Sequence, residues 1–218
     1  MEAMLLLRFF SSPRKLDLCG LAALLFFGWA GHSRADYDVP AAPAHDPAQV
    51  RVDVSIDAQM VYVMEGDRPL LVTAACSGKY GHRTPLGSFR VTDKDARKRS
   101  GEFGFWGRDG RWLAGGSGSS PGAGWSFVGY PMAFWVGFQD GIGFHEGYVW
   151  PVPRSHGCIR LPHRVAPKFF ALVGVGTPVS VARSQPEDET LGRNAPRPSD
   201  YRDPDPPARH MVSDDVFE

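Results

Sequence analysis

The pattern of hydrophobic and polar positions predicts short β-strands across residues 50–182. Residues 50–56 alternate valine or isoleucine with polar side chains, the period of two that a half-buried strand shows. Further apolar-rich segments of strand length follow at residues 60–64, 70–75, 88–92, 132–138, 141–145 and 177–182. The turn-forming Glu-Gly-Asp at 65–67 predicts a hairpin. Closely spaced strands with glycine-rich turns favour a mainly β sandwich or barrel over alternating strand–helix units.

Three segments of this region are expected to differ from strands. Residues 93–99 are nearly all charged and are expected to form a solvated loop. Residues 100–124 are rich in glycine, serine and aromatic side chains and are expected to form a long loop, a feature that is often functional in compact domains. Residues 162–173 carry spaced apolar side chains with a proline near the start, which predicts a short helix.

The two ends of the chain do not share this pattern. Basic residues near the N-terminus precede an apolar run at 18–30, which is shorter than the roughly 18 residues that a membrane span requires. Small residues then precede a possible cleavage point after Ala35, so residues 1–35 are expected to be a secretory signal peptide. An uncleaved membrane anchor is the alternative. Residues 36–49 are expected to be a linker, and the acidic, proline-rich residues 183–218 a disordered tail.

Charge and cysteine content exclude two classes of protein. Lys plus Arg and Asp plus Glu each number 24 among 218 residues, so the formal net charge is zero. A nucleic-acid-binding protein normally shows a basic excess, so no nucleic-acid partner is expected. Three cysteines are too few for a disulfide scaffold. With the signal peptide removed, the protein is expected in the periplasm or outside the cell, without a stable membrane span.

The candidate chemistry lies in two neighbouring segments, 141–147 and 155–161. A cysteine nucleophile acts as its thiolate and needs a base or a cation nearby. His145 and His156 both lie within 13 residues of Cys158 in the sequence. Together these residue types in so short a stretch indicate nucleophilic catalysis by cysteine.

Two further features of the second segment fit that chemistry. Backbone N–H groups at Gly157 and Cys158 could form an oxyanion hole. The guanidinium of Arg160 carries a permanent positive charge and paired N–H donors, which suit a substrate carboxylate.

A metal site is the physical alternative to a cysteine nucleophile. His145, His156, Cys158 and His163 offer the mixed nitrogen and sulfur ligands that zinc accepts. The chain lacks a second cysteine pair, and these residues do not have the familiar i, i+4 ligand spacing. We therefore expect no metal and no other cofactor.

The segment Ser155-His-Gly-Cys-Ile-Arg-Leu161 resembles the signature of the L,D-transpeptidase catalytic domain, the YkuD-type family. Residues 81–89 are similar to the Thr-Pro-x-Gly-x-Phe segment of that family, and residues 141–147 to its His-x-Gly segment. The likeness covers about residues 50–182. It implies a β-sandwich of mixed sheets with one or two short helices.

The resemblance also implies a role for each candidate residue. Cys158 would be the nucleophile and His145 the general base, with His156 as a neighbouring residue that shapes the site. The backbone carbonyl of Glu146 would orient the imidazole of the base. The Glu146 carboxylate, directly after the base, is expected to raise the pKa of His145 and favour an imidazolium–thiolate pair.

The resemblance implies peptidoglycan stem peptides as substrate, bound with help from Ser155, Gly157 and Arg160. Cys158 would attack the bond before a terminal D-alanine, release D-alanine and leave a thioester. An amine of a second stem would then take the acyl group and complete a 3→3 cross-link. Carbapenems are expected to inhibit such a site.

Other activities remain open from the sequence. An L,D-carboxypeptidase would use water as acceptor, and a hydrolase would cut cross-links or protein links to peptidoglycan. A non-catalytic cell-wall-binding domain is the alternative outside the enzymes. Cys76, at the end of an expected strand, is expected to be a buried core thiol, because a disulfide with Cys158 would block the nucleophile.

Overall fold

The computed structural model describes residues 37–198 and 206–218, so the expected signal peptide at 1–35 lies outside the described residues. The first of its two five-stranded sheets has the strand order β3-β2-β1-β10-β4. The strands of this sheet are β1 (Val50–Ser55), β2 (Met60–Glu65), β3 (Arg68–Ala74), β4 (Gly87–Arg90) and β10 (Pro178–Ala182). β1 and β10 are parallel, whereas the other neighbours are antiparallel, as β2 and β3 are in the expected hairpin.

The second sheet has the strand order β6-β5-β7-β8-β9 and carries the candidate catalytic segments. Its strands are β5 (Asp93–Arg108), β6 (Arg111–Gly116), β7 (Ser126–Gln139), β8 (Ile142–Glu146) and β9 (Ile159–Leu161). β8 and β9 are parallel and the other pairs antiparallel, so both sheets are mixed. The predicted mainly β fold with mixed sheets and few short helices is confirmed.

A chain of phenylalanine rings joins the two sheets and the helix α1 (Ala166–Leu172). Phe89 on β4 contacts Phe138 on β7, with ring centroids 5.3 Å apart. Phe138 contacts Phe144 at 5.2 Å, and Phe144 contacts Phe169 of α1 at 4.6 Å. Phe138, Phe144 and Phe169 are almost wholly buried, so this apolar layer fixes β8, and with it the site, against the rest of the core.

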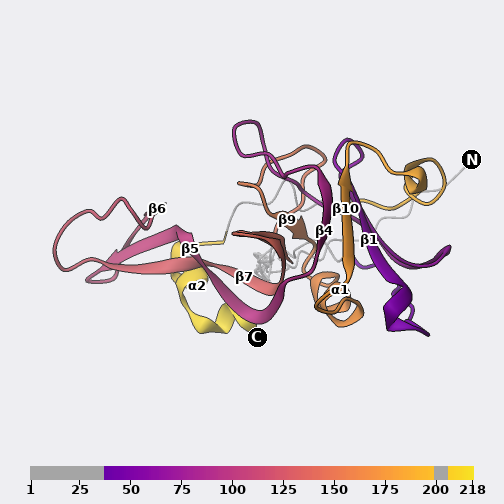
Figure 1. Ribbon diagram of the computed structural model, residues 1–218. Helices are drawn as coiled ribbons and strands as arrows, with labels where there is room; N and C mark the ends of the chain where they lie inside the picture. The colour runs from indigo at the N-terminus through magenta and orange to yellow at the C-terminus, as the bar shows by residue number, and fades with distance from the viewer. Residues whose placement is uncertain (1–36, 199–205) are drawn as a thin grey trace, which may run out of the picture. The chain divides into compact units, whose positions relative to one another are not determined.

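The segments expected as loops at 93–99 and 100–124 are largely strands, which corrects the sequence prediction. The charged residues 93–99 form the first part of β5 and keep most of their side chains partly or fully exposed while the backbone pairs with β7. Further along, glycines make room for large rings: a Cβ at Gly107 would lie 2.2 Å from the Trp112 ring. Figure 1 shows the resulting ribbon of β5, β6 and β7 extending away from β1 and β10.

The described part of the expected linker, residues 37–49, packs against the domain. Tyr37 and Val39 are buried, at 9% and 4% exposure. The Tyr37 hydroxyl donates a hydrogen bond to the backbone oxygen of Pro196, at 3.1 Å. The short 3-10 helix η1 (Pro47–Gln49) leads directly into β1.

The structure also differs from the expectation of a disordered tail. Residues 183–198 contain the 3-10 helix η2 (Pro186–Glu189), which lies against the first sheet. The Asp188 carboxylate accepts hydrogen bonds from Tyr62, at 2.7 Å, and from Ser55, at 2.8 Å. Acidic residues that composition assigns to solvent are thus paired with polar side chains of β1 and β2.

The second described part of that tail, 206–218, forms the helix α2 (Ala208–Val212) and the 3-10 helix η4 (Asp214–Phe217). Met211 is 5% exposed, so this segment is docked rather than free. Among all residues described, no helix is long and apolar enough to cross a bilayer.

Candidate active site

The parallel pair β8 and β9 brings the two candidate segments together. In the register of this pair, His145 on β8 lies opposite Arg160 on β9. Cys158 directly precedes β9, so in this register it lies beside Gly143, two residues before His145 on β8. The loop that joins the two strands is held by backbone hydrogen bonds between Ser155 and Ser77 and between Gly147 and Leu161, at 3.0 and 2.9 Å.

A cleft of about 750 Å³ contains the side chains of four of the predicted site residues, His145, His156, Cys158 and Arg160. Its other walls come mainly from β5 and β7, which contribute aromatic and apolar side chains and one cation: Lys98, Phe103, Phe105, Tyr130, Met132 and Trp135. The ribbon that sequence reasoning assigned to a loop is therefore a wall of the cleft.

His145 is held in one tautomer by its neighbour. Its Nδ1 donates to the backbone carbonyl of Glu146 at 2.7 Å, which leaves Nε2 as the proton acceptor. The pKa of this imidazole is not raised as expected, and the Glu146 carboxylate accepts a hydrogen bond from Nδ1 of His163 at 2.8 Å. Burial, reinforced by the positive charge of Arg160, instead lowers the pKa of His145 to about 4, and the Glu146 hydrogen bond only partly opposes this.

Cys158 is a free thiol in a partly buried position. Burial raises the pKa of the Cys158 thiol, while a backbone hydrogen bond from Gly143 and the charges of Arg160 and Lys98 act in the opposite direction. The thiol donates to the backbone oxygen of Gly141, with 3.6 Å between sulfur and oxygen. The lowered pKa of His145 and the raised pKa of Cys158 both favour the uncharged forms at neutral pH, which is the opposite of the expected imidazolium–thiolate pair.

Ser155 and Gly157, predicted to help bind the substrate, are buried residues of the nucleophile loop. Ser155 is 1% exposed, and its hydroxyl donates to the backbone carbonyl of Cys158. The same hydroxyl accepts from the Gly157 N–H at 3.1 Å, so that N–H is engaged and not available as the expected oxyanion donor. The carbonyl of Gly157 accepts from Thr84, at 2.7 Å, and Thr84 in turn accepts from Gly78. Through Thr84, the Thr-Pro segment therefore stabilises this loop.

His156 and Arg160 also line the cleft. The His156 ring packs on Phe103 and His82, with centroids 4.7 and 4.8 Å away. Partial burial and the nearby positive charges of Lys79, His82 and Arg160 lower the pKa of His156. The Arg160 guanidinium lies 5.7 Å from the Trp150 ring. Both residues therefore border the space in which a substrate would lie.

Sequence reasoning missed three residues around the catalytic pair. Gly143 directs its N–H to the Cys158 sulfur and has no room for a side chain, because a Cβ would lie 2.5 Å from the backbone oxygen of Val136. The spacing Gly-x-Gly-x-His was a usable signal for it. Trp135 stacks on His145, with centroids 6.4 Å apart, and Lys98 lies 4.7 Å from the Trp135 ring. No local sequence signal indicates Trp135 and Lys98, because they are far from Cys158 in the sequence and are brought to the site by β7 and β5.

The structure also bears on Cys76 and on the alternative of a metal site. Cys76 is fully buried and unpaired, which confirms the expected core thiol. In the described ranges, no three His, Cys, Asp or Glu side chains are grouped as a metal ion would need. His163 pairs with Glu146 instead.

The depressed pKa of His145 predicts acid-sensitive folding. Between the ordinary value of 6.5 and about 4, the unfolded imidazole binds a proton and the folded one does not. Stability is therefore lost as the pH falls through this window, by on the order of 3 kcal/mol once it has been crossed. Urea unfolding at pH 7 and pH 4 measures it, with His145→Gln as the matched variant. Equal pH dependence in the two proteins would contradict the buried, neutral imidazole.

The fold and the site define a mainly β protein with a cysteine–histidine pair in a cleft. The family model of the YkuD L,D-transpeptidase catalytic domain matches residues 49–181, well over half of the chain, so the chain belongs to this family. A comparison with curated proteins finds no match.

Solved L,D-transpeptidases are similar to this chain at low identity. The enzyme from Stackebrandtia nassauensis is 20% identical over 67% of this chain and 60% of that one, with a TM-score of 0.45. The enzyme from Mycobacterium smegmatis is 23% identical over 62% and 58%, with a TM-score of 0.48. A third structure, from Enterococcus faecium, is 24% identical over 62% and 50%, with a TM-score of 0.46. This chain thus spans only half to three-fifths of the length of these proteins.

Proposed function

We propose that the protein is a cysteine L,D-transpeptidase that forms 3→3 cross-links between peptidoglycan stem peptides in the cell envelope. The observation that carries this proposal is the arrangement of Cys158 and His145 in one cleft. His145 presents Nε2 as a proton acceptor, because Glu146 occupies Nδ1. A neutral base in the same cleft as a neutral thiol is suited to removing the thiol proton during attack.

The first half-reaction forms the thioester. The stem lies in the cleft with its terminal carboxylate near the cations Arg160 and Lys98, which both line it. As the Cys158 sulfur attacks the carbonyl carbon of the third residue, His145 takes the thiol proton. The tetrahedral intermediate then collapses, and the D-alanine amine leaves with that proton.

The second half-reaction restores the thiol. The amine of a second stem attacks the thioester and gives a proton to His145. The carbon–sulfur bond breaks, and the proton returns to the Cys158 sulfur. The envelope as the place of the reaction is proposed from the signal-peptide-like sequence at 1–35. Carbapenems are proposed as inhibitors, because a strained lactam carbonyl can take the place of the stem carbonyl at the thiol.

The test is incubation of the protein with a synthetic stem tetrapeptide ending in D-alanine, followed by mass spectrometry. A dimer lighter than two tetrapeptides by one D-alanine is the expected product. Tripeptide alone would assign the protein as an L,D-carboxypeptidase, with water as acceptor. An unchanged tetrapeptide with folded, reduced protein would overturn the proposed function.

A further inference from the structure

The C-terminal segment 206–218 lies outside the family domain but next to the cleft. Its helix α2 packs against β6 and β7, and Figure 1 shows it in yellow beside β5 and β7. Pro206 and Met211 of this segment line the same cleft as Cys158. The chain therefore adds a part to the site that the family domain at 49–181 does not contain.

Arg99 on β5 attaches this segment to the ribbon. Its guanidinium donates to the backbone oxygens of Met211 and Ser213, each at 2.9 Å, and to the Asp214 carboxylate at 3.0 Å. The last carbonyls of a helix have no partner within the helix, so a cation with several donors satisfies them well. The same guanidinium also donates to the backbone oxygen of Gly129 on β7, at 3.1 Å. One side chain thus ties β5, β7 and the end of α2 together.

An aromatic contact reinforces this attachment. The ring of Phe217 lies 4.9 Å from the Arg99 guanidinium and 5.5 Å from that of Arg97. Arg99 keeps only 21% of its side chain exposed. Both cations of the charged run therefore contact the C-terminal segment, and Arg99 is in addition largely withdrawn from solvent.

Strand geometry links this attachment to the wall of the cleft. Neighbouring residues of a strand point to opposite faces, so Lys98 and Arg99 face different sides of β5. Lys98 and its partner Met132 line the cleft, whereas Arg99 and its partner Pro131 are on the other face. The pairing of β5 with β7 is interrupted between Arg99 and Gly104, where regular strand hydrogen bonds cannot fix the shape.

We propose that the C-terminal segment sets the shape of the substrate cleft, with Arg99 as the positioning residue. By clamping β5 to β7 at the irregular part of the ribbon, it holds Phe103, Phe105 and Lys98 where an extended stem peptide lies. His145 is on β8 and Cys158 directly precedes β9, whereas the hydrogen bonds of the Arg99 guanidinium go to Gly129 of β7 and to the C-terminal segment. This inference rests on the proposed function, since the stem peptide is the occupant.

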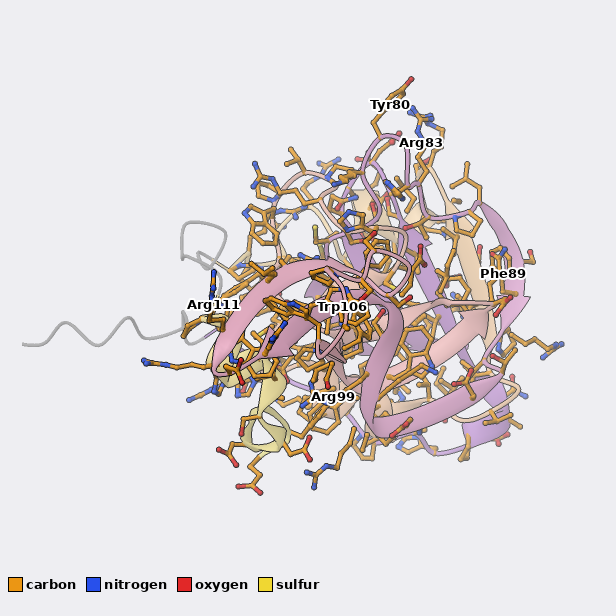
Figure 2. All side chains as sticks on the ribbon, turned by 90° about the vertical axis from the view of Figure 1, so that its left-hand side faces the viewer. Tyr80, Arg83, Phe89, Arg99, Trp106 and Arg111 are labelled. Atoms are coloured by element: carbon orange, nitrogen blue, oxygen red, sulfur yellow. The ribbon has the colours of Figure 1, made fainter. Side chains whose placement is uncertain are left out.

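Binding and chemistry are measured separately to test it. In a Cys158→Ala background, calorimetry with the stem tetrapeptide is expected to show about tenfold weaker binding after Arg99→Ala, equivalent to ~1.4 kcal/mol. Arg99→Lys is expected to restore part of the affinity, because an ammonium can still bond some of the carbonyls. Arg111→Ala is the matched control, an exposed arginine of the same ribbon, and is expected to bind as the background does (Figure 2). Acylation of Cys158 by a small carbapenem is expected to remain unchanged in Arg99→Ala.

Each other result has a defined meaning. Unchanged affinity in Arg99→Ala, or an equal loss of acylation and affinity, would overturn the inference and leave Arg99 a structural role. If Arg99→Ala does not fold, a chain ending at Pro198 takes its place in the same two measurements. If the wild type is neither acylated nor able to turn over stems, while Arg99→Ala still weakens stem binding, the proposed function is overturned and the inference on Arg99 stands. An absence of stem binding in every variant would overturn both.

Discussion

Replacing Cys158 with alanine is expected to abolish the covalent adduct that a carbapenem forms with the wild-type protein. The sulfur is the atom that forms the acyl bond, and alanine offers no nucleophile in its place. Cys158 is only partly buried, so removing its sulfur atom disturbs little core packing. The variant is therefore expected to fold. Intact-mass spectrometry after incubation measures the effect as all or none.

Cys76→Ala is the matched control for this experiment. Cys76 is fully buried, and its backbone pairs with that of Arg160 on β9, so its thiol does not face the cleft. The variant is expected to keep the complete adduct. An adduct on Cys158→Ala would place the nucleophile elsewhere. No adduct on reduced, folded wild type would favour the non-catalytic cell-wall-binding domain.

The strands of the first sheet could be predicted because each has one local, periodic signal. Residues 50–56 alternate cleanly, and the Glu-Gly-Asp turn after residue 64 fits the observed hairpin of β2 and β3. In β5 and β6 the same reasoning failed. Charged residues on an exposed ribbon and glycines beneath tryptophan rings carry no apolar alternation, although most of the backbone pairs with neighbouring strands.

The site could be predicted in its members but not in its electrostatics. The motif around Cys158 and His145 named residues that the structure does bring into one cleft. The protonation state depends on burial and on Arg160, which becomes a neighbour of His145 only through the pairing of β8 and β9. The hydrogen-bond partner of the Glu146 carboxylate could not be predicted either, since His163 lies 17 residues away in the sequence.

The tail shows how composition can mislead about order. Residues 183–218 are acidic and proline-rich, yet Asp188 is bound by two side chains of the first sheet, and Met211 is buried. Few apolar residues are enough for docking when the domain offers matching polar groups. Arg99 and Tyr62 are such groups, and neither can be assigned to the tail without the fold.

His145→Ala is expected to lower the rate of acylation by about 10²- to 10⁴-fold, the usual contribution of a general base. The neutral thiol of Cys158 makes the base necessary, because burial raises the pKa of that thiol and few thiolates exist at pH 7. His156→Ala is the matched control. It removes a second imidazole from the same cleft and is expected to have a much smaller effect, because the His156 ring packs on Phe103.

The pH profile of acylation identifies the base independently of the size of the loss. The imidazole must be neutral to take a proton, and the pKa of His145 is about 4, so wild-type acylation is expected to persist in mild acid and fall only near that pH. His145→Ala should lose this acid limb, whereas His156→Ala should keep it. Wild-type rates in His145→Ala, with the limb displaced in His156→Ala, would transfer the role of base to His156.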